Sequence, residues 1–190
     1  QTLPSPSRAF RSFAKGSGTA GLPASTVVAL HTDTEGTVWI ATFNGAARVE
    51  HGSVERVVDR NGPATGAIFR IIDRRAGGVY VSATNGLYLY DNGRWSLTPT
   101  PAEFIHIAED GAANIVALDR RGILYVKPAG SSSWTDLPGT TDQADFRGLA
   151  SMADGSVVAA GRTGLVQVAN GAVTGPIGSA PPSPLTTVLT

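Results

Sequence analysis

Four stretches of this chain repeat one plan of strands and tight turns, and this repeat constrains the fold more than any other feature. The clearest copy, VVALHTDTEGTVWIATFNGAARV, spans residues 27–49, and a weaker copy, ATGAIFRIIDRRAGGVYVSATNGLYLY, spans 64–90. Each copy has a glycine in its second turn: Gly45, Gly86, Gly122 and Gly164. These glycines are 41, 36 and 42 residues apart. Four-stranded units with such a period are typical of β-propeller blades.

Short turns separate the strands inside each copy, and they contain the residues that tight turns prefer. In the clearest copy, Asp33–Gly36 lies between strand-like runs at 27–32 and 37–42. An aspartate that begins a turn accepts a hydrogen bond from the backbone two residues on, and a glycine supplies a positive φ. The pairs Asn44-Gly45 and Asn85-Gly86 are strong hairpin signals because both residue types tolerate positive φ.

The second strand of every copy is almost wholly apolar. These strands read VWIAT, VYVSA, IVALD and VVAAG. Continuous apolar runs of this length are typical of strands that are covered on both faces by neighbouring layers. The sequence therefore predicts an all-β fold, a β-propeller arc of about four to five four-stranded blades.

The predicted blades occupy most of the chain. Their approximate bounds are 27–58, 64–98, 103–137 and 145–175. An outer strand is predicted at 9–13, and the start of a further blade at 185–190. Because unpaired sheet edges favour association with other chains, we expect the arc either to belong to a larger propeller or to close by self-association.

Composition argues against several classes of partner. Fifteen basic and fifteen acidic residues give a formal net charge of zero, so no electrostatic footprint indicates nucleic acid or an anionic membrane. The chain has no cysteine, which excludes disulfide and thiolate chemistry. No segment reaches the roughly 18 apolar residues of a membrane span. We expect no nucleic-acid partner and no direct membrane insertion of this segment.

The clearest copy resembles the two-component regulator propeller repeat. The stretch GLPASTV at 21–27 is followed by DTEGTVWIAT at 33–42 and then by Asn44-Gly45. The family pattern runs roughly GLPxxxV, DxxGxxWIGT and xGL. Ala41 stands where the family usually has Gly, and Ala46 stands where it usually has Leu. The second copy keeps five of the positions: Gly77, Tyr80, Asn85, Gly86 and Leu87.

This resemblance implies a sensor region on the periplasmic or extracellular side of a membrane-bound bacterial signalling protein. Family members often hold seven-bladed propellers, followed in the chain by a histidine kinase or diguanylate cyclase module. Any such activity would lie outside these residues, so we expect a non-catalytic propeller that binds a ligand or mediates interactions. Two alternatives remain open: a propeller that serves only protein–protein contact, and a propeller-type lyase or glycosidase.

A ligand is expected at the channel mouth. In a propeller the innermost strand lines the channel, and the loop leading into it emerges beside the loop between the second and third strands. Aromatic, amide and guanidinium groups at these places suit a small molecule such as a sugar or a carboxylate, although the asparagines equally suit the turns alone. The candidate binding residues are Phe43, Asn44, Phe69, Arg70, Asn85, His106, Arg121 and Arg162.

Other motifs have simpler structural explanations. The sequence GSGTAG at 16–21 matches a dinucleotide-binding pattern, but a proline and a strand follow it instead of a helix. His31 and Asp33 are two residues apart and suit one face of a strand, but two ligands make a weak metal site. We therefore predict no cofactor and no metal. The three tryptophans are assigned to blade packing rather than to ligand stacking: Trp39, Trp95 and Trp134.

Overall fold

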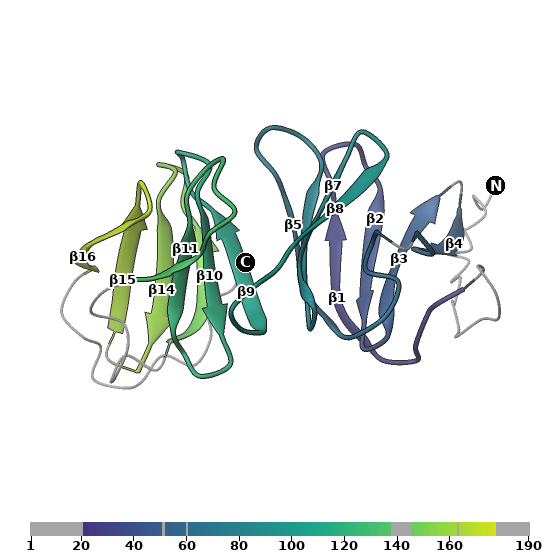
Figure 1. Cartoon of the computed structure of the whole chain (residues 1–190), viewed down its shortest axis with the longest axis horizontal. Helices are drawn as coiled ribbons and strands as arrows, with labels where there is room; N and C mark the ends of the chain where they lie inside the picture. Colours follow the sequence, from purple (N-terminus) through teal and green to yellow (C-terminus); the bar gives the residue numbers. More distant parts are fainter. Residues whose placement is uncertain (1–20, 51, 60, 138–145, 163, 178–190) are drawn as a thin grey trace, which may run out of the picture.

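The computed structural model describes residues 21–50, 52–59, 61–137, 146–162 and 164–177. These residues form four antiparallel sheets of four strands each, with no helix among them (Figure 1). Every sheet is built from consecutive strands, and the sheets follow one another through the molecule as propeller blades do. The predicted all-β propeller fold is thus confirmed. The strand predicted at 9–13 and the further blade predicted at 185–190 lie outside the described residues.

The strands have the following bounds. The first blade comprises β1 (Val27–Thr32), β2 (Val38–Thr42), β3 (Gly45–Glu50) and β4 (Ser53–Arg56). The second comprises β5 (Ile68–Asp73), β6 (Val79–Ala83), β7 (Gly86–Asp91) and β8 (Arg94–Thr98). The third comprises β9 (Phe104–Glu109), β10 (Ile115–Asp119), β11 (Leu124–Lys127) and β12 (Thr135–Asp136). The fourth comprises β13 (Phe146–Ser151), β14 (Val157–Gly161), β15 (Gly164–Ala169) and β16 (Ala172–Ile177).

The apolar second strands lie where the sequence places them, between neighbouring layers. Every residue of β6, β10 and β14 is buried. Side chains of successive blades share hydrophobic clusters, so burial of apolar surface holds each blade against the next. Examples across the three blade boundaries are Trp39 with Val79, Leu87 with Phe104, and Leu118 with Phe146.

The three tryptophans pack within or between blades, as predicted. Trp39 is 1% exposed and meets Trp95 of the second blade edge-to-face, with ring centroids 5.8 Å apart. Trp134 packs on Phe104 with centroids 4.6 Å apart. Such aromatic pairs add stability beyond the area that they bury.

The turn after β1 has the local chemistry that its sequence indicates. Asp33 Oδ1 accepts hydrogen bonds from the backbone N–H groups of Glu35 at 3.0 Å and Thr37 at 2.8 Å. Asp33 Oδ2 accepts one from Trp39 Nε1 at 2.7 Å. Gly36 has a φ of +85°, a conformation that glycine adopts without steric cost. One aspartate therefore closes the turn and orients the buried tryptophan.

The inner strands β1, β5, β9 and β13 share an irregularity at their second residue. Their pairing with the neighbouring strand shifts by one residue there, which is a β-bulge. A bulge bends the strand and redirects its side chains. The bulged residues are Val28, Phe69, Ile105 and Arg147.

The two ends of the inner strands lie on opposite faces of the arc, the mouth face and the base face. The mouth face holds the first residues of the inner strands and the turns β2–β3, β6–β7, β10–β11 and β14–β15. The base face holds their last residues and the turns β1–β2, β5–β6, β9–β10 and β13–β14. In Figure 1 the arrow of β1 points from the mouth toward the base. Within the described ranges, no helix has the length and apolar character needed to cross a bilayer.

Candidate functional site

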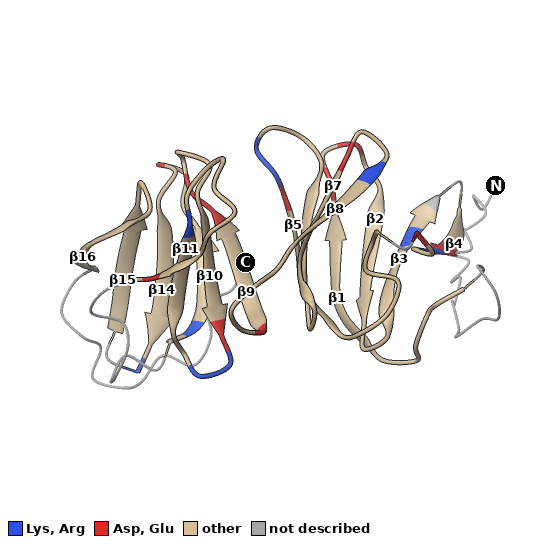
Figure 2. Ribbon diagram, viewed as in Figure 1, with Lys and Arg blue, Asp and Glu red and all other residues tan. Residues whose placement is uncertain are grey.

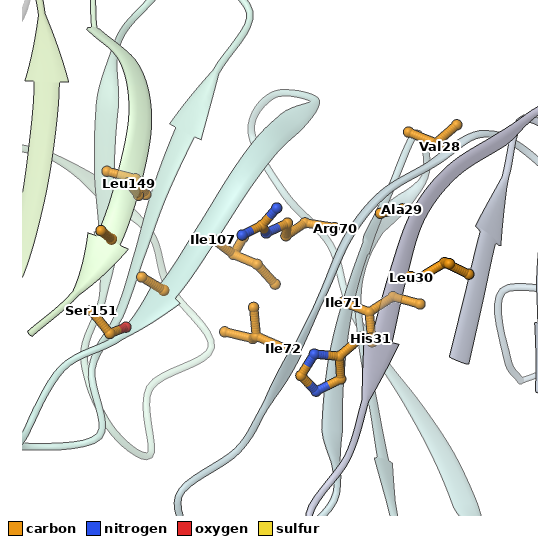
Figure 3. A pocket seen from close by; sticks show the side chains of 12 residues that line it. Val28, Ala29, Leu30, His31, Arg70, Ile71, Ile72, Ile107, Leu149 and Ser151 are labelled. Carbon is orange, nitrogen blue, oxygen red and sulfur yellow. The ribbon is translucent and has the colours of Figure 1, made fainter. Parts of the chain in front are cut away.

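A groove of about 600 Å³ lies between the four inner strands (Figure 3). Each inner strand contributes to it, so it occupies the place of the propeller channel. Its walls are mainly aliphatic: Val28, Ala29, Leu30, Ile71, Ile72, Ile107, Ala108, Leu149 and Ala150. Its polar lining residues are His31, Arg70 and Ser151. No Asp or Glu is among these twelve described residues.

Arg70 on β5 is the cation of this groove. Its side chain extends from β5 toward Ile107 of β9, across the space between the second and third blades (Figure 3). Partial burial lowers the pKa of Arg70, because a guanidinium loses hydration in such a place. Arginine remains protonated even so, so its charged guanidinium lies among the apolar side chains of the described lining.

His106 occupies the place on β9 that Arg70 occupies on β5. Each pairs with the fourth residue of the neighbouring strand, Leu118 for His106 and Ser82 for Arg70. Burial is the main cause that lowers the pKa of His106, and the charge of Arg70 lowers it further, while a hydrogen bond with the Arg147 backbone raises it. Its Nδ1 atom is buried and has no hydrogen-bond partner in the described part of the chain. His106 does not itself line the groove.

The equivalent places on β1 and β13 hold small residues. Ala29 pairs with Ala41, and Gly148 pairs with Ala160, each the fourth residue of its strand. The row around the channel therefore reads Ala29, Arg70, His106 and Gly148. Arg70 and His106 lie in the middle of this row, and the residues on either side of them have a small side chain or none.

Phe69 lies beside this row at the mouth and contacts an arginine of the third blade. The Arg120 guanidinium carbon lies 4.8 Å from the centroid of the Phe69 ring, a cation–π geometry. Arg120 Nε also donates to Glu103 Oε2 at 2.8 Å. The sequence did not distinguish Arg120 from Arg121, and our site prediction named Arg121.

Arg121 is held within its own blade. Its Nε donates to Asp119 Oδ2 at 2.9 Å, and its Nη2 donates to the Tyr125 hydroxyl at 2.9 Å. The hydrogen bond with Asp119, followed by the charge of Asp119, raises the pKa of Arg121. Sequence adjacency carries no signal for which of two arginines turns toward the next blade.

The remaining predicted residues stay on their own turns. Asn85 Nδ2 donates to the Tyr88 hydroxyl at 2.6 Å, which gives it a role inside the hairpin. Asn44 lies in a separate hollow of about 250 Å³ with Pro23, Arg56 and Val58. Phe43 and Arg162 are exposed. The structure thus gathers Phe69, Arg70 and His106 near the channel and leaves the other five apart.

His31 and Asp33 do not act together. His31 Nε2 lies 3.1 Å from Asp73 Oδ1 on β5, whereas Asp33 accepts bonds from its own turn and from Trp39. The bulge in β1 and the placement of β5 beside it bring His31 to the second blade. Among the described residues, no group of three or more His, Cys, Asp or Glu side chains is arranged to hold a metal ion.

The first blade carries the part of the sequence that a known family describes. Residues 21–44 match the model of the two component regulator propeller family. These residues are a two-component regulator propeller repeat. The repeat covers the lead into β1, the Asp33 turn and β2, so the family pattern coincides with the hydrogen bonds from Asp33 to Trp39.

Solved structures with a similar fold include two extracellular domains of B. thetaiotaomicron proteins. One protein is described as a one component system (TM-score 0.65, 17% identity, covering 92% of this chain and 24% of that chain). The other is described as a hybrid two component system (TM-score 0.63, 13% identity, 85% and 23%). This chain therefore spans about a quarter of the length of each of these two extracellular domains.

An enzyme has the same fold. A catalytically inactive virginiamycin B lyase from Staphylococcus aureus, in a structure with quinupristin, is similar with a TM-score of 0.64 and 14% identity, covering 86% of this chain and 59% of that chain. Identities this low establish the shared propeller fold and no more. The search of curated proteins returns no significant match.

Proposed function

We propose that this propeller is the sensor region of a bacterial signal-transduction protein, facing the periplasm or the exterior, and that it acts by binding rather than by catalysis. The observation that carries the proposal is the regulator propeller repeat at residues 21–44. The fold similarity to two extracellular domains of signalling proteins is consistent with it. The ligand-binding region would be the channel groove, which all four inner strands line.

The placement of the carboxylates favours binding over catalysis. Asp33, Asp110 and Asp119 each accept backbone hydrogen bonds within their own turns. An acid or base catalyst must reach a substrate proton, and these three carboxylates are directed into turns. Among the twelve described residues that line the groove, none is an Asp or Glu.

Two other functions remain as alternatives. A propeller used only for protein contact would need no channel ligand, and a propeller lyase would use the same fold, as virginiamycin B lyase does. The groove that all four inner strands line favours a small ligand over either alternative.

The coding sequence on both sides of codons 1–190 tests the sensor proposal. We expect a membrane-spanning segment together with a kinase or cyclase module in the same protein. In intact cells the propeller should then be cleaved by protease once the outer barrier is opened, with the inner membrane still sealed. A gene that encodes neither a membrane span nor an output module would contradict the proposal.

A further inference from the structure

We propose that Asn92 is a site of spontaneous deamidation, and that the fold directs this reaction to the pair Asn92-Gly93 while it protects the other Asn-Gly pairs. The chain has six asparagines, and five of them precede a glycine: Asn44, Asn61, Asn85, Asn92 and Asn170. The inference goes beyond the proposed sensor function and does not depend on it.

The reaction needs only water and the atoms of the pair itself. The backbone nitrogen of Gly93 gives up its proton to the solvent and attacks Cγ of Asn92, so that a C–N bond forms and the Cγ–Nδ2 bond breaks. Nδ2 leaves as ammonia, and a five-membered succinimide ring remains. Water then opens the ring at one of its two carbonyl groups, which leaves aspartate or isoaspartate. The glycine nitrogen must therefore be reachable by solvent and able to turn toward the side chain.

All five asparagines are exposed, so the difference lies in the glycine that follows each one. Three of these glycines are buried: Gly45, Gly62 and Gly86. Each packs closely against another segment, because a Cβ at these positions would lie 2.6 Å, 2.8 Å and 2.7 Å from its nearest neighbour, respectively. The N–H groups of Gly45 and Gly62 also donate to the carbonyl oxygens of Gly66 and Asp59. These nitrogens are held in place and shielded from solvent.

The fourth pair, Asn170-Gly171, forms the same kind of turn as Asn92-Gly93. Both are two-residue hairpin turns with a positive φ at each position, 48° and 77° in the turn of Asn92 and 51° and 72° in the turn of Asn170. Such angles are typical of a type I′ turn. The Gly171 N–H, however, donates to the buried Asp110 carboxylate at 2.8 Å. This charge-assisted bond must break before the nitrogen can react.

Gly93 has none of these constraints. It is exposed, and a Cβ at its position would have no atom within 4 Å beyond its chain neighbours. Within the described part of the chain, its N–H donates no hydrogen bond. The Asn92 side chain donates from Nδ2 to Asp91 Oδ1 at 2.9 Å, in an exposed bond that water can replace. Solvent therefore reaches the reacting nitrogen at this pair.

The product would place a new negative charge beside existing ones. Asn92 lines a hollow of about 240 Å³ at the base, between the first two blades, together with the acidic residues Asp33, Glu35 and Asp91. Deamidation replaces the Nδ2 donor to Asp91 with a carboxylate, and isoaspartate also lengthens the turn by one backbone atom. Like charges at such short range repel one another, so we expect the product to be less stable than the original protein.

Incubation of the folded 190-residue chain in mildly alkaline buffer, followed by mass spectrometry of its peptides, tests the proposal. Fragmentation of the tryptic peptide 76–94 distinguishes Asn85 from Asn92. We expect Asn92 to deamidate about tenfold faster than Asn170, and faster than the other three asparagines, because only its glycine nitrogen needs no bond or packing contact to be broken. Another asparagine reacting fastest in the folded chain would overturn the proposal.

The chain unfolded in guanidinium chloride is the control for the role of the fold. Each of the five asparagines then has the same residue after it and the same access to solvent, so the five rates should become comparable. If Asn92 kept its full advantage in the unfolded chain, the local sequence and not the fold would direct the reaction, and the proposal would fail.

Substitutions confirm the site and its consequence. Asn92→Gln, which makes ring closure slower, should remove the fast release of ammonia, whereas the matched variant Asn170→Gln should leave it unchanged. Asn92→Asp represents the aspartate product and should lower the melting temperature by about 1–2 °C, with a smaller loss in high salt. An unchanged or raised melting temperature would contradict the repulsion that we infer in the hollow.

Discussion

The mouth and the base of the propeller use their polar residues in different ways. At the base, a hydrogen bond crosses each of the three described blade boundaries: His31 to Asp73 at 3.1 Å, Arg75 N–H to Glu109 Oε2 at 2.5 Å, and Gly171 N–H to Asp110 Oδ2 at 2.8 Å. Near the mouth, Phe69, Arg70 and His106 lie at or beside the bulges of β5 and β9, and of these three only Arg70 lines the groove. The turn between β10 and β11 adds basic residues there, visible as the blue loop at the bottom of Figure 2, beneath β10.

This difference separates polar groups that hold neighbouring blades together from polar groups that a ligand could reach. At the base, Glu109 and Asp110 accept hydrogen bonds from backbone N–H groups, and Asp73 pairs with the His31 ring of the neighbouring blade. The bases near the mouth influence each other instead, since the charge of Arg70 lowers the pKa of His106. We therefore expect substitutions at the base to change mainly stability, and substitutions in the channel row to change mainly binding.

The largest loss of stability is expected from Asp110→Ala. Asp110 is fully buried and accepts hydrogen bonds from Ala112, Asn114 and, across the blade boundary, Gly171. Its removal leaves several buried donors without a partner, which should cost about 3 kcal/mol in the free energy of unfolding. Urea denaturation measures this loss.

Asp154→Ala is the matched control for that substitution. Asp154 is exposed and accepts bonds from the backbone and hydroxyl of Ser156 in the corresponding region of the fourth blade. Its loss should be clearly smaller. If Asp110→Ala cannot be purified, Asp110→Asn serves in its place. An Asp110 variant as stable as Asp154→Ala would break the distinction that we draw for the base.

A glycine substitution on the mouth side tests whether that face is also constrained by its backbone. Gly45 has a φ of +106°, and a Cβ there would lie 2.6 Å from the carbonyl oxygen of Ala64. Gly45→Ala should destabilise the protein by about 2–3 kcal/mol. The Ala64 backbone must move to make room for the new Cβ, and alanine is strained at this positive φ.

Gly36→Ala provides the comparison at the base. Gly36 has a φ of +85° but no atom within 4 Å of a Cβ, so only the conformational cost of about 1 kcal/mol is expected. Thermal unfolding of both variants measures the contrast. Equal losses would mean that the close approach of the Ala64 backbone imposes no constraint.

Two acids at equivalent strand ends allow a finer test of the base. Glu109 ends β9 and is 5% exposed, whereas Asp73 ends β5 and its side chain is 35% exposed. Glu109→Gln should cost about 1–2 kcal/mol, because the buried charged acceptor of the Arg75 N–H is replaced by a neutral and weaker one. Asp73→Asn should cost less than about 1 kcal/mol, as partly exposed ion pairs do. Chemical denaturation that ranks Asp73→Asn as the more harmful change would refute this account of the blade boundaries.

The smallest expected effect is a pH dependence from His106 in the channel row. Burial and the charge of Arg70 lower its pKa below the ordinary value of 6.5, so the unfolded chain binds the proton more readily than the folded protein. With respect to His106, the folded protein therefore has its full stability above pH 6.5. This stability is lost as the pH falls from 6.5, the pKa in the unfolded chain, through the lower pKa in the folded protein.

A His106→Asn variant isolates this contribution. Unfolding free energies at about pH 7.5 and about pH 5.5 should decline less for the variant than for the unmodified protein. An identical decline would show that protonation of His106 does not influence folding, and that Arg70 and His106 are not coupled.

Local chemistry explains what the sequence by itself determined. The Asp33 turn, the hairpin glycines and the buried second strands depend on residues that lie two to six positions apart. Turn geometry and side-chain alternation act over that range. The all-β propeller, the role of Trp39 and the repeat at 21–44 were therefore predictable from the chain alone.

Contacts between blades were decided only by the tertiary structure. Nothing in the order of residues pairs His31 with Asp73, 42 positions away, or turns Arg120 rather than Arg121 toward Phe69. Such contacts depend on how each bulged inner strand is rotated against the next blade, and this rotation follows from packing of whole sheets. For the same reason, the sequence predicted Arg70 and His106 for the channel, but not that Arg70 lines the groove while His106 does not, nor that the charge of Arg70 lowers the pKa of His106.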